Sequence, residues 1–396
     1  MFWFPMARRI SPEARTALYY FVSFTSSGAA VAYAGIWFSQ QGLSAAEIGI
    51  VNALPVLIML GLNLVVGRLA DRAGDWRQVI VVGALLSAAI PFGLFFAHGF
   101  WGILVVWTCG ALPVAAIAPV ADAAALRLTQ RNGTDFGVVR GWGTVGYMAF
   151  NFVPGILVSL FGAMIFVPLY VFLNFMRGVV ALALPNFRRP ATMPTVAGVL
   201  APPTASKLGQ VMRPWFLLPL IGSAIVFATH IILNAFAALL WQRQGISPAV
   251  IGPLIALGAF AEAATMFAWR RVGARFSART VLLVSALASV VRWTAMGFSP
   301  PVYVLVFLQL LQSLTFALGY LGSVHFIAKW TGEDIAAEAQ SLFVVLQQVA
   351  TVIALAGFGW LVGIMGAYGY LVAAGFAFLA AGFIMLSMKL RQPTLA

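Results

Sequence analysis

Long apolar runs separated by short polar segments fill this chain. A helix needs about 20 apolar residues to cross a bilayer, and the runs have this length. The segments on one side are only a few residues long, so no external loop forms a folded domain. The pattern predicts an all-α membrane protein with twelve transmembrane helices, at roughly 17–38, 47–66, 79–97, 101–126, 141–161, 164–185, 215–240, 249–269, 280–298, 302–328, 337–362 and 367–388.

A nine-residue segment occurs twice, each time between two apolar runs. Gln41–Gly49 reads QGLSAAEIG, and Gln244–Gly252 reads QGISPAVIG. Tandem halves of membrane helices are typical of secondary transporters, which hold the substrate where the halves meet. A chance match in an apolar sequence is the alternative. We expect an N-terminal six-helix bundle at 1–186, a polar, proline-rich cytoplasmic connector at 187–214, and a C-terminal six-helix bundle at 215–396.

Composition and charge agree with a membrane protein. Hydrophobic residues make up 62% of the 396 residues and charged residues only 8%, too few for a soluble surface. With both termini in the cytoplasm, 19 of the 23 Lys and Arg residues lie in cytoplasmic segments, whereas Arg243 lies outside. The net charge of +13 therefore indicates contact with anionic lipid and no nucleic-acid partner. We expect a monomer in a bacterial-type inner (plasma) membrane, with the first span retained.

The residues of enzyme and metal sites do not cluster in this sequence. The three histidines lie in separate segments, and the single cysteine, Cys109, lies in the fourth span, where we interpret it as a packing residue. No nucleophile with an adjacent base and no metal-ligand spacing is present. The sequence predicts neither an enzyme nor a cofactor or metal site. A receptor that binds a solute without transporting it remains an alternative.

The polar segment after the second span carries a recognisable signature. Gly67–Arg77 reads GRLADRAGDWR. Its glycines permit a tight cytoplasmic turn, and Asp71 is able to cap the following backbone or pair with a basic residue. Ser44 and Glu47 have the spacing of a capping box, which predicts the start of the second span.

This segment resembles the loop signature of the major facilitator superfamily, Gly-x-Leu-Ala-Asp-Arg-x-Gly. Asp75 and Trp76 replace the basic pair that follows the second glycine in the family. The resemblance implies two pseudo-symmetric six-helix bundles around a central cavity, working by alternating access with protons and a small molecule as transported partners. It also implies a gating loop that contains Gly67, Asp71, Arg72 and Gly74.

Ionisable side chains inside predicted spans are costly in a bilayer and are functional by default. Asp122 and His325 are 203 residues apart, the offset of the repeat, and are expected at matching places. Charges of both signs in each half suggest ion pairs that open and re-form, a physical basis for proton coupling. We interpret Arg177 as structural and His325 as a packing or gating residue, and His230 is either a core or a functional histidine. The candidates are Asp122, Arg140, Arg177, His230, Glu262, Arg292 and His325.

Two blocks resemble the phenylpropionate permease branch of the superfamily, which is related to the lactose permease and to nucleoside–proton symporters. The first is Pro119–Asp122 with Asp135–Gly146, and the second runs from His230 to Trp293. By motif position, the resemblance places substrate binding on Asp122 and Arg140, and matches Glu262 and Arg292 to the family's span-eight acid and span-nine arginine.

The tenth span departs from the pattern of these relatives. Where relatives carry Gln-x-Leu-His, the sequence reads Gln309-Leu-Leu-Gln312, and the nearest histidine is His325. The histidine-centred part of the family's coupling network is therefore not implied for this chain.

These observations predict a secondary transporter for proton-coupled uptake of an aromatic carboxylate such as phenylpropionate. Arg140 or Arg292 would pair with the carboxylate, and Asp122 and Glu262 would couple protonation to closure. Sugar or nucleoside symport, with Asp122 accepting hydroxyl hydrogen bonds, and proton-driven efflux of lipophilic compounds remain alternatives. Candidate partners for a substrate ring are Tyr19, Tyr20, Trp37 and Tyr147.

Overall fold

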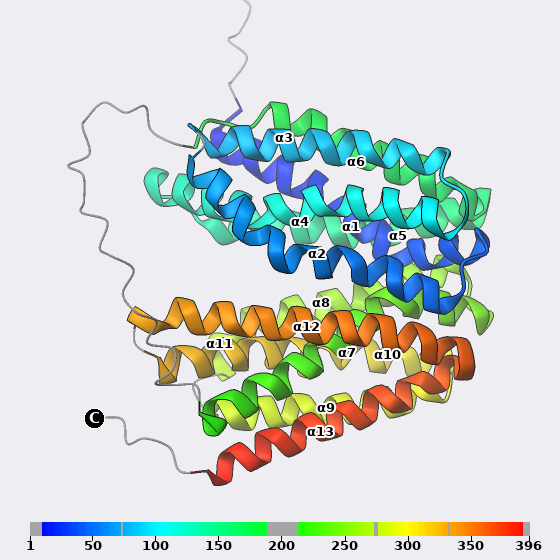
Figure 1. Cartoon of the computed structure of the whole chain (residues 1–396), viewed down its shortest axis with the longest axis vertical. Coiled ribbons are helices and arrows are strands. Elements are labelled where there is room, and N and C mark those ends of the chain that lie inside the picture. Colours follow the sequence, from blue (N-terminus) through cyan, green and yellow to red (C-terminus); the bar gives the residue numbers. More distant parts are fainter. Residues whose placement is uncertain (1–9, 73, 188–212, 273–275, 332, 391–396) are drawn as a thin grey trace, which may run out of the picture. The chain divides into compact units, whose positions relative to one another are not determined.

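The structure is a computed structural model that describes residues 10–72, 74–187, 213–272, 276–331 and 333–390. These residues form helices and short connections (Figure 1). The helices are α1 (Pro12–Gln40), α2 (Ala45–Arg72), α3 (Trp76–Ala89), α4 (Gly99–Asn132), α5 (Phe136–Phe161), α6 (Phe166–Leu182), α7 (Pro214–Arg243), α8 (Pro248–Val272), α9 (Ala278–Gly297), α10 (Val302–Leu310), α11 (Leu318–Trp330), α12 (Glu333–Met365) and α13 (Gly369–Lys389).

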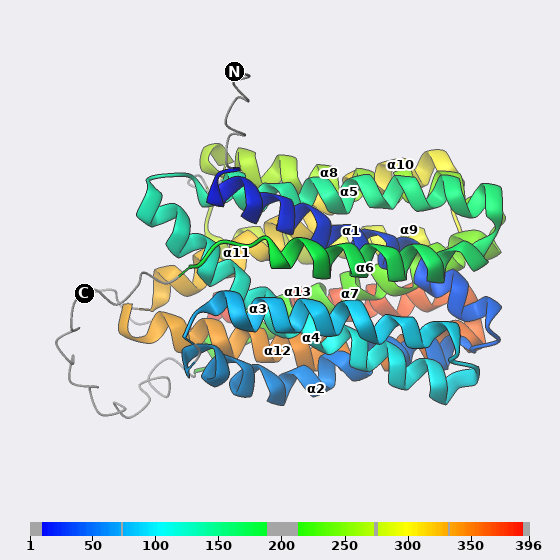
Figure 2. The same ribbon diagram turned by 90° about the horizontal axis from the view of Figure 1, so that it is seen from above.

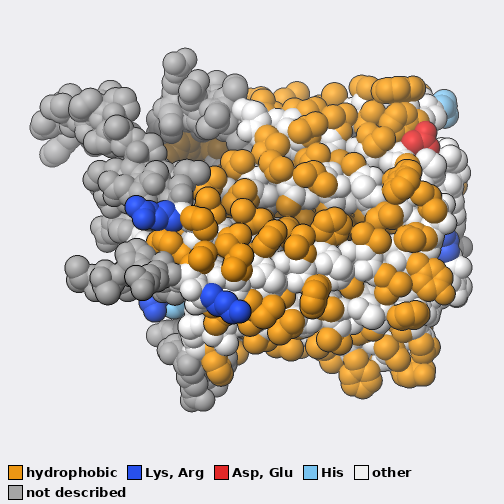
Figure 3. All heavy atoms as spheres, turned by 60° about the horizontal axis from the view of Figure 1, so that its bottom comes forward, with side chains coloured by type: hydrophobic (Ala, Val, Ile, Leu, Met, Phe, Trp, Pro, Cys, Tyr) orange, Lys and Arg blue, Asp and Glu red, His pale blue; other side chains and the backbone are white. Residues whose placement is uncertain are grey.

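Eleven segments of the described chain are long and apolar enough to cross a membrane. The last of them, Ala339–Lys389, is 51 residues long and contains all of α13 with most of α12. Hydrophobic side chains cover the middle of the face shown in Figure 3, and charged side chains lie toward its two ends. A multi-pass membrane architecture is confirmed, while the count of twelve crossings and the cytoplasmic termini stay predictions.

The two copies of the repeated segment have the same local structure. Gln41–Gly49 connects α1 to α2, and Gln244–Gly252 connects α7 to α8. In each copy, the second residue is a glycine with a positive φ, 83° at Gly42 and 89° at Gly245. Other residues rarely adopt this conformation, so the repeat includes a residue that both turns require.

The helix boundaries near the signature segment differ from the sequence prediction. The capping box is confirmed, because Ser44 N–H donates to Glu47 Oε2 at 2.8 Å and Glu47 N–H donates to Ser44 Oγ at 3.3 Å. The second span was predicted to end at residue 66, whereas α2 continues to Arg72. The turn forms later, where the Asp75 carboxylate caps α3 by accepting Arg77 N–H at 2.7 Å.

The described chain divides into two compact units. The first contains residues up to 30, 61–150 and 165–193, and the second contains 31–60, 151–164 and the remainder. Most of the expected connector, 187–214, lies outside the described residues. The division into bundles at 1–186 and 215–396 stays a prediction.

In the first unit, α3 packs against both α4 and α6 (Figure 2). Their shared core contains small and β-branched side chains such as Ala84, Ile117 and Ala124, together with Tyr19 of α1. Small residues let membrane helices approach closely. This packing fixes the position of α4, which carries Asp122.

In the second unit, α7 packs against α12 and α13, and α13 packs against α9 (Figure 1). The tenth predicted span consists of α10, a π-helical turn at Ser313–Ala317 and α11. π-helical turns are rare, and those that occur are often at functional sites. This turn is therefore a candidate position for the site.

Candidate functional site

In the first unit, Asp122 of α4 accepts two hydrogen bonds on one oxygen. Tyr20 Oη of α1 donates to its Oδ1 at 2.7 Å, and Arg140 Nε of α5 donates at 3.2 Å. The Asp122 side chain is 44% exposed. Asp122 and Arg140 form an ion pair within the first unit, and Tyr20 joins it.

Glycines on α5 create the space that Arg140 occupies. The Arg140 guanidinium lies 4.3 Å from the centre of the Phe24 ring, a cation–π contact. A Cβ at Gly143 would lie 3.0 Å from Arg140 Nη1, and one at Gly146 would collide with the Phe21 carbonyl oxygen. Gly143 and Gly146 of the Gly-Trp-Gly-Thr-Val-Gly run therefore lie on the face of α5 that contacts α1.

Arg177 of α6 is buried and bound to uncharged groups. Its guanidinium donates to the Ser23 carbonyl and to Ser26 Oγ on α1, and to Asn174 Oδ1 at 2.8 Å. The side chain does not reach toward water. These contacts join α6 to α1, in agreement with the structural role that we expected for this arginine.

In the second unit, Arg292 of α9 is completely buried and has three neutral oxygen partners. Its Nη2 donates to Gln309 Oε1 at 2.6 Å, and its Nη1 donates to Thr315 Oγ1 at 3.0 Å and to Gln312 Oε1. Among the residues that the structure describes, its Nε finds no hydrogen-bond partner. No described carboxylate forms an ion pair with this guanidinium.

The two glutamines extend this arrangement toward α8. Gln309 Nε2 donates to the Leu254 carbonyl at 3.0 Å. Gln312, whose Oε1 accepts from Arg292, also neighbours the Glu262 carboxylate. Glu262 and Arg292 are thus connected through one neutral side chain.

His230 of α7 lies at the opposite end of the same network. Its Nδ1 is 2.8 Å from the Val226 carbonyl, and its Nε2 is 2.8 Å from Thr315 Oγ1. A carbonyl only accepts, so Nδ1 carries a hydrogen. The tautomer of a neutral His230 therefore leaves Nε2 as an acceptor for the Thr315 hydroxyl.

Thr315 sits in the π-helical turn with its hydroxyl shared among several partners. The hydroxyl also lies 3.0 Å from the Leu311 carbonyl, and the Thr315 carbonyl accepts from Ser285 Oγ at 2.6 Å. The hydrogen bond from Ser285 satisfies the Thr315 carbonyl, which lies in an irregular turn. The turn thereby presents one hydroxyl to both His230 and Arg292.

Aromatic rings enclose the His230 end of the network. Trp293 lies edge-on to His230 with ring centres 5.0 Å apart and stacks on Tyr370 at 5.8 Å. Phe316 contacts the other side of His230 at 5.4 Å. Trp293 Nε1 donates to Thr229 Oγ1 at 2.9 Å, so its ring is held in place at both ends.

The structure does not bring all candidates together. His325 is exposed on α11 and takes no part in the hydrogen bonds around Arg292. Cys109 is exposed on α4, so its interpretation as a packing residue is wrong. Tyr19, Tyr20 and Trp37 are buried, so none of them offers a free face to a substrate ring. The side chains of Asp71 and Arg72 lie outside the described ones.

Three central residues of the network were not identified as site residues from the sequence. In the sequence, Gln309 and Gln312 stand out only as a departure from the pattern of relatives, and Thr315 carries no signal. Their signal was weak, because uncharged polar side chains in membrane helices also serve helix packing. Among the described residues, no group of three metal-binding side chains occurs.

Comparisons with known proteins identify the family of this chain. The model of the MFS_1 like family matches residues 14–363. The chain is 28% identical over 347 residues to the probable 3-phenylpropionic acid transporter of Escherichia coli (strain K12), covering 86% of each chain. It is also 28% identical over 336 residues to the maltose permease of Geobacillus stearothermophilus, covering 82% of this chain and 81% of that one.

Solved structures agree on the fold. A mutant of the nucleoside transporter NupG has a TM-score of 0.83 at 18% identity, covering 96% of this chain and 100% of that chain. A bacterial homologue of the human lysosomal transporter Spinster, in an inward-facing conformation, has a TM-score of 0.76 at 16% identity, covering 96% of each. The family match covers most of the chain, and the chain therefore belongs to the MFS_1 like family of major facilitator superfamily transporters.

Proposed function

We propose that this transporter takes up a small aromatic carboxylate together with a proton. The observation that carries the proposal is Arg292, a buried guanidinium whose described partners are amide and hydroxyl oxygens. A buried charge without a counter-charge is costly. A carboxylate substrate would supply the missing negative charge, and an arginine binds carboxylates through paired N–H donors.

Arg292 suits the substrate carboxylate better than Arg140 does. Arg140 already has Asp122 as its acidic partner. Around Arg292, Gln312 is the least buried of the three oxygen partners, at 9% exposed against 2% for Gln309 and none for Thr315. The substrate carboxylate would replace the Gln312 oxygen and release the Gln312 side chain toward Glu262.

The Thr315 hydroxyl offers a way to link the carboxylate to a proton. Its single hydrogen goes to Nε2 of a neutral His230, or to the Leu311 carbonyl when Nε2 carries its own hydrogen. A protonated His230 would share Thr315 Oγ1 with the Arg292 cation. A carboxylate bound at Arg292 would balance this added charge, so the proton and the anion would bind together.

A small hollow beside the π-helical turn supports access for a proton. It has a volume of about 10 Å³ and is lined by Thr315, Ser223, Tyr320 and Gln347 among others. A space of this size, with several polar groups, is close to the minimum for one water molecule. Such a water would connect the Thr315 hydroxyl to the polar side chains around it.

In the first unit, the partly exposed Asp122 is proposed as the second coupling group. Its carboxylate is held by Arg140 and Tyr20. Loss of the Arg140 contact during transport would leave it with Tyr20 alone. In this proposal, release of the Gln312 side chain changes the surroundings of the neighbouring Glu262 carboxylate.

A titration with a matched pair of ligands tests the carboxylate assignment. Purified protein would be titrated with 3-phenylpropionate and with 3-phenylpropanamide, which has the same shape without the negative charge. We expect the wild type to prefer the acid and Arg292→Gln to bind both equally. A preference for the acid that survives in Arg292→Gln would remove Arg292 from the site. The exposed Arg243, changed to Gln, is the control.

Sugar or nucleoside symport is the second candidate, and one observation favours it. The Asp122 carboxylate is 44% exposed, so its oxygens remain accessible to hydroxyl donors, and one relative is a maltose permease. Saturable binding of maltose or uridine, with none of 3-phenylpropionate, would select this candidate.

A further inference from the structure

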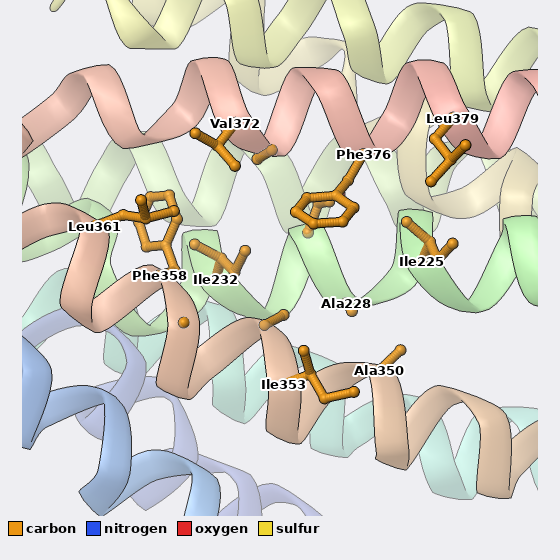
Figure 4. A pocket seen from close by; sticks show the side chains of 14 residues that line it. Ile225, Ala228, Ile232, Ala350, Ile353, Phe358, Leu361, Val372, Phe376 and Leu379 are labelled. Carbon is orange, nitrogen blue, oxygen red and sulfur yellow. The ribbon is translucent and has the colours of Figure 1, made fainter.

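An apolar groove runs along the second unit between α12 and α13, with α7 as its floor (Figure 4). Its volume is about 310 Å³. Ile353 and Phe376 stand on its two walls and are more than half exposed, whereas Ala228 and Ala373 at its base are buried. The groove therefore opens to the surroundings of the helices, and its lining includes none of the three side chains that bond to Arg292.

Small side chains create the groove. Ala228, Ala350, Ala354 and Ala373 contribute only methyl groups to its lining. At Gly357, no atom lies within 4 Å of the position that a Cβ would take. Helices in membranes usually use such residues to pack against each other, yet here α12 and α13 leave the space between them open.

We propose that this groove binds one acyl chain of a bilayer lipid. The lining explains why the ligand is a hydrocarbon. Thr229 is the single polar residue of the lining, and its hydroxyl already donates to the Val226 carbonyl at 2.6 Å and accepts from Trp293. No polar group in the groove awaits a partner, so a ligand gains nothing from polar atoms there.

The dimensions of the groove match one leaflet. From Ala350 to Leu361, the α12 wall is about 16 Å long at the rise of an α-helix. Half of the hydrocarbon core is about 15 Å deep. The Leu361 end lies near the Gly366–Tyr368 turn between the two wall helices, and the other end lies near the middle of the spans.

Aromatic side chains mark the end where the chain enters. Trp360 and Tyr368 are more than half exposed beside the Leu361 end, and exposed Trp and Tyr residues are typical of the membrane–water interface. By the distribution of basic residues this is the outer interface. The headgroup would lie at this level, with its acyl chain reaching inward along the groove.

The volume argues against a helix of a second copy as the ligand. A helix 10 Å wide and 16 Å long occupies on the order of 1,300 Å³, which exceeds the open space in the groove. A single extended hydrocarbon chain is thinner and follows the curved surface between α12 and α13.

Photolabelling of the full chain tests the site. The protein would be reconstituted in vesicles of phosphatidylethanolamine that include a probe with a diazirine in the middle of one acyl chain, and labelled peptides would be mapped by mass spectrometry. We expect label concentrated in residues 350–361 and 372–379. Label spread evenly over all exposed helices would overturn the proposal, as would crosslinks to a second copy in place of lipid.

Two glycines of α12 provide a matched pair of variants. Gly357→Phe would fill the groove, whereas Gly363→Phe, on the same helix and also in open space, lies outside the lining. We expect Gly357→Phe to lose the label at both peptides and Gly363→Phe to keep it. Label that survives in Gly357→Phe would contradict the site. If that variant does not fold, Ala354→Leu replaces it, and the wild-type map stands on its own.

Discussion

At the scale of residues, Arg140 and Arg292 differ in what surrounds them. Arg140 has a carboxylate, a tyrosine and a phenylalanine as neighbours. Arg292 is more deeply buried, yet its hydrogen bonds go to Gln309, Gln312 and Thr315. Hydrogen bonds to neutral oxygens offset part of the cost of burying a cation, and a bound anion would offset more.

Replacement of Arg292 by lysine tests the need for a planar donor. We expect Arg292→Lys to weaken binding of 3-phenylpropionate by roughly ten- to a hundredfold, because an ammonium does not reproduce the paired N–H donors of a guanidinium. A binding titration measures the effect. Arg243→Lys, on the exposed end of α7, is expected to bind like the wild type. Equal affinity in both variants would contradict the role of Arg292.

Replacement of Thr315 tests the link between the proton and the anion. Thr315→Val removes the hydroxyl shared by His230 and Arg292 and keeps the shape of the side chain. We expect it to lose accumulation driven by a proton gradient while exchange of substrate across the membrane persists. Thr315→Ser should restore accumulation. Full accumulation by Thr315→Val would show that the hydroxyl is not required.

Replacement of Asp122 tests the coupling group of the first unit. Asp122→Asn keeps an acceptor for Tyr20 and Arg140 but cannot carry a negative charge. We expect a folded protein without gradient-driven accumulation. Glu47→Gln changes a half-buried carboxylate at the start of α2 and serves as the control. Accumulation at the wild-type level in Asp122→Asn would remove Asp122 from the coupling mechanism.

The sequence predicted the charged members of the site better than the neutral ones. Asp122, Arg140 and Arg292 stood out because a charge in a membrane helix requires a reason. Gln312 and Thr315 carry no charge, and only the three-dimensional arrangement reveals that both contact Arg292. His325 was a candidate because it is ionisable and lies inside a predicted span at the repeat offset from Asp122, but equivalent places in two halves need not have equivalent surroundings.

At the scale of elements, the glycines of α5 set how closely it packs on α1. A Cβ at Gly146 would collide with the Phe21 carbonyl oxygen, which belongs to the backbone of α1 and cannot rotate away. At Gly141, on the same helix, no atom lies within 4 Å of the Cβ position. The same residue type thus has different importance at two positions of one motif.

This contrast predicts different stabilities for two alanine variants. We expect Gly146→Ala to destabilise the protein by about 1–3 kcal/mol, the usual cost of overpacking, and to lower its melting temperature. Gly141→Ala should melt no lower than the wild type. Thermal unfolding in detergent, followed by tryptophan fluorescence, compares the two. Equal melting temperatures would contradict the close α1–α5 contact.

Helix ends were predictable where a side chain defines them. The start of α2 follows from the Ser44–Glu47 capping box. Its other end was placed too early, because the glycine and charged residues from Gly67 onward were interpreted as a loop. Helix α2 continues to Arg72, and the turn forms where Asp75 caps α3. Charged residues remain helical where a helix continues beyond the apolar part of its span.

At the scale of the whole molecule, the repeated segment and the apolar pattern identified the class of protein. Both copies connect two helices through a left-handed glycine, and the family match covers residues 14–363. The fold does not determine the substrate, because the same fold serves transporters of different solutes. It must therefore be decided at the site.

Uptake of labelled 3-phenylpropionate into proteoliposomes tests the central claim most directly. Wild type and Arg292→Gln would be compared with an inward proton gradient and after its collapse. We expect 3-phenylpropionate to accumulate only with the wild type and only while the gradient is present. Accumulation that persists after collapse of the gradient, or in Arg292→Gln, would contradict it.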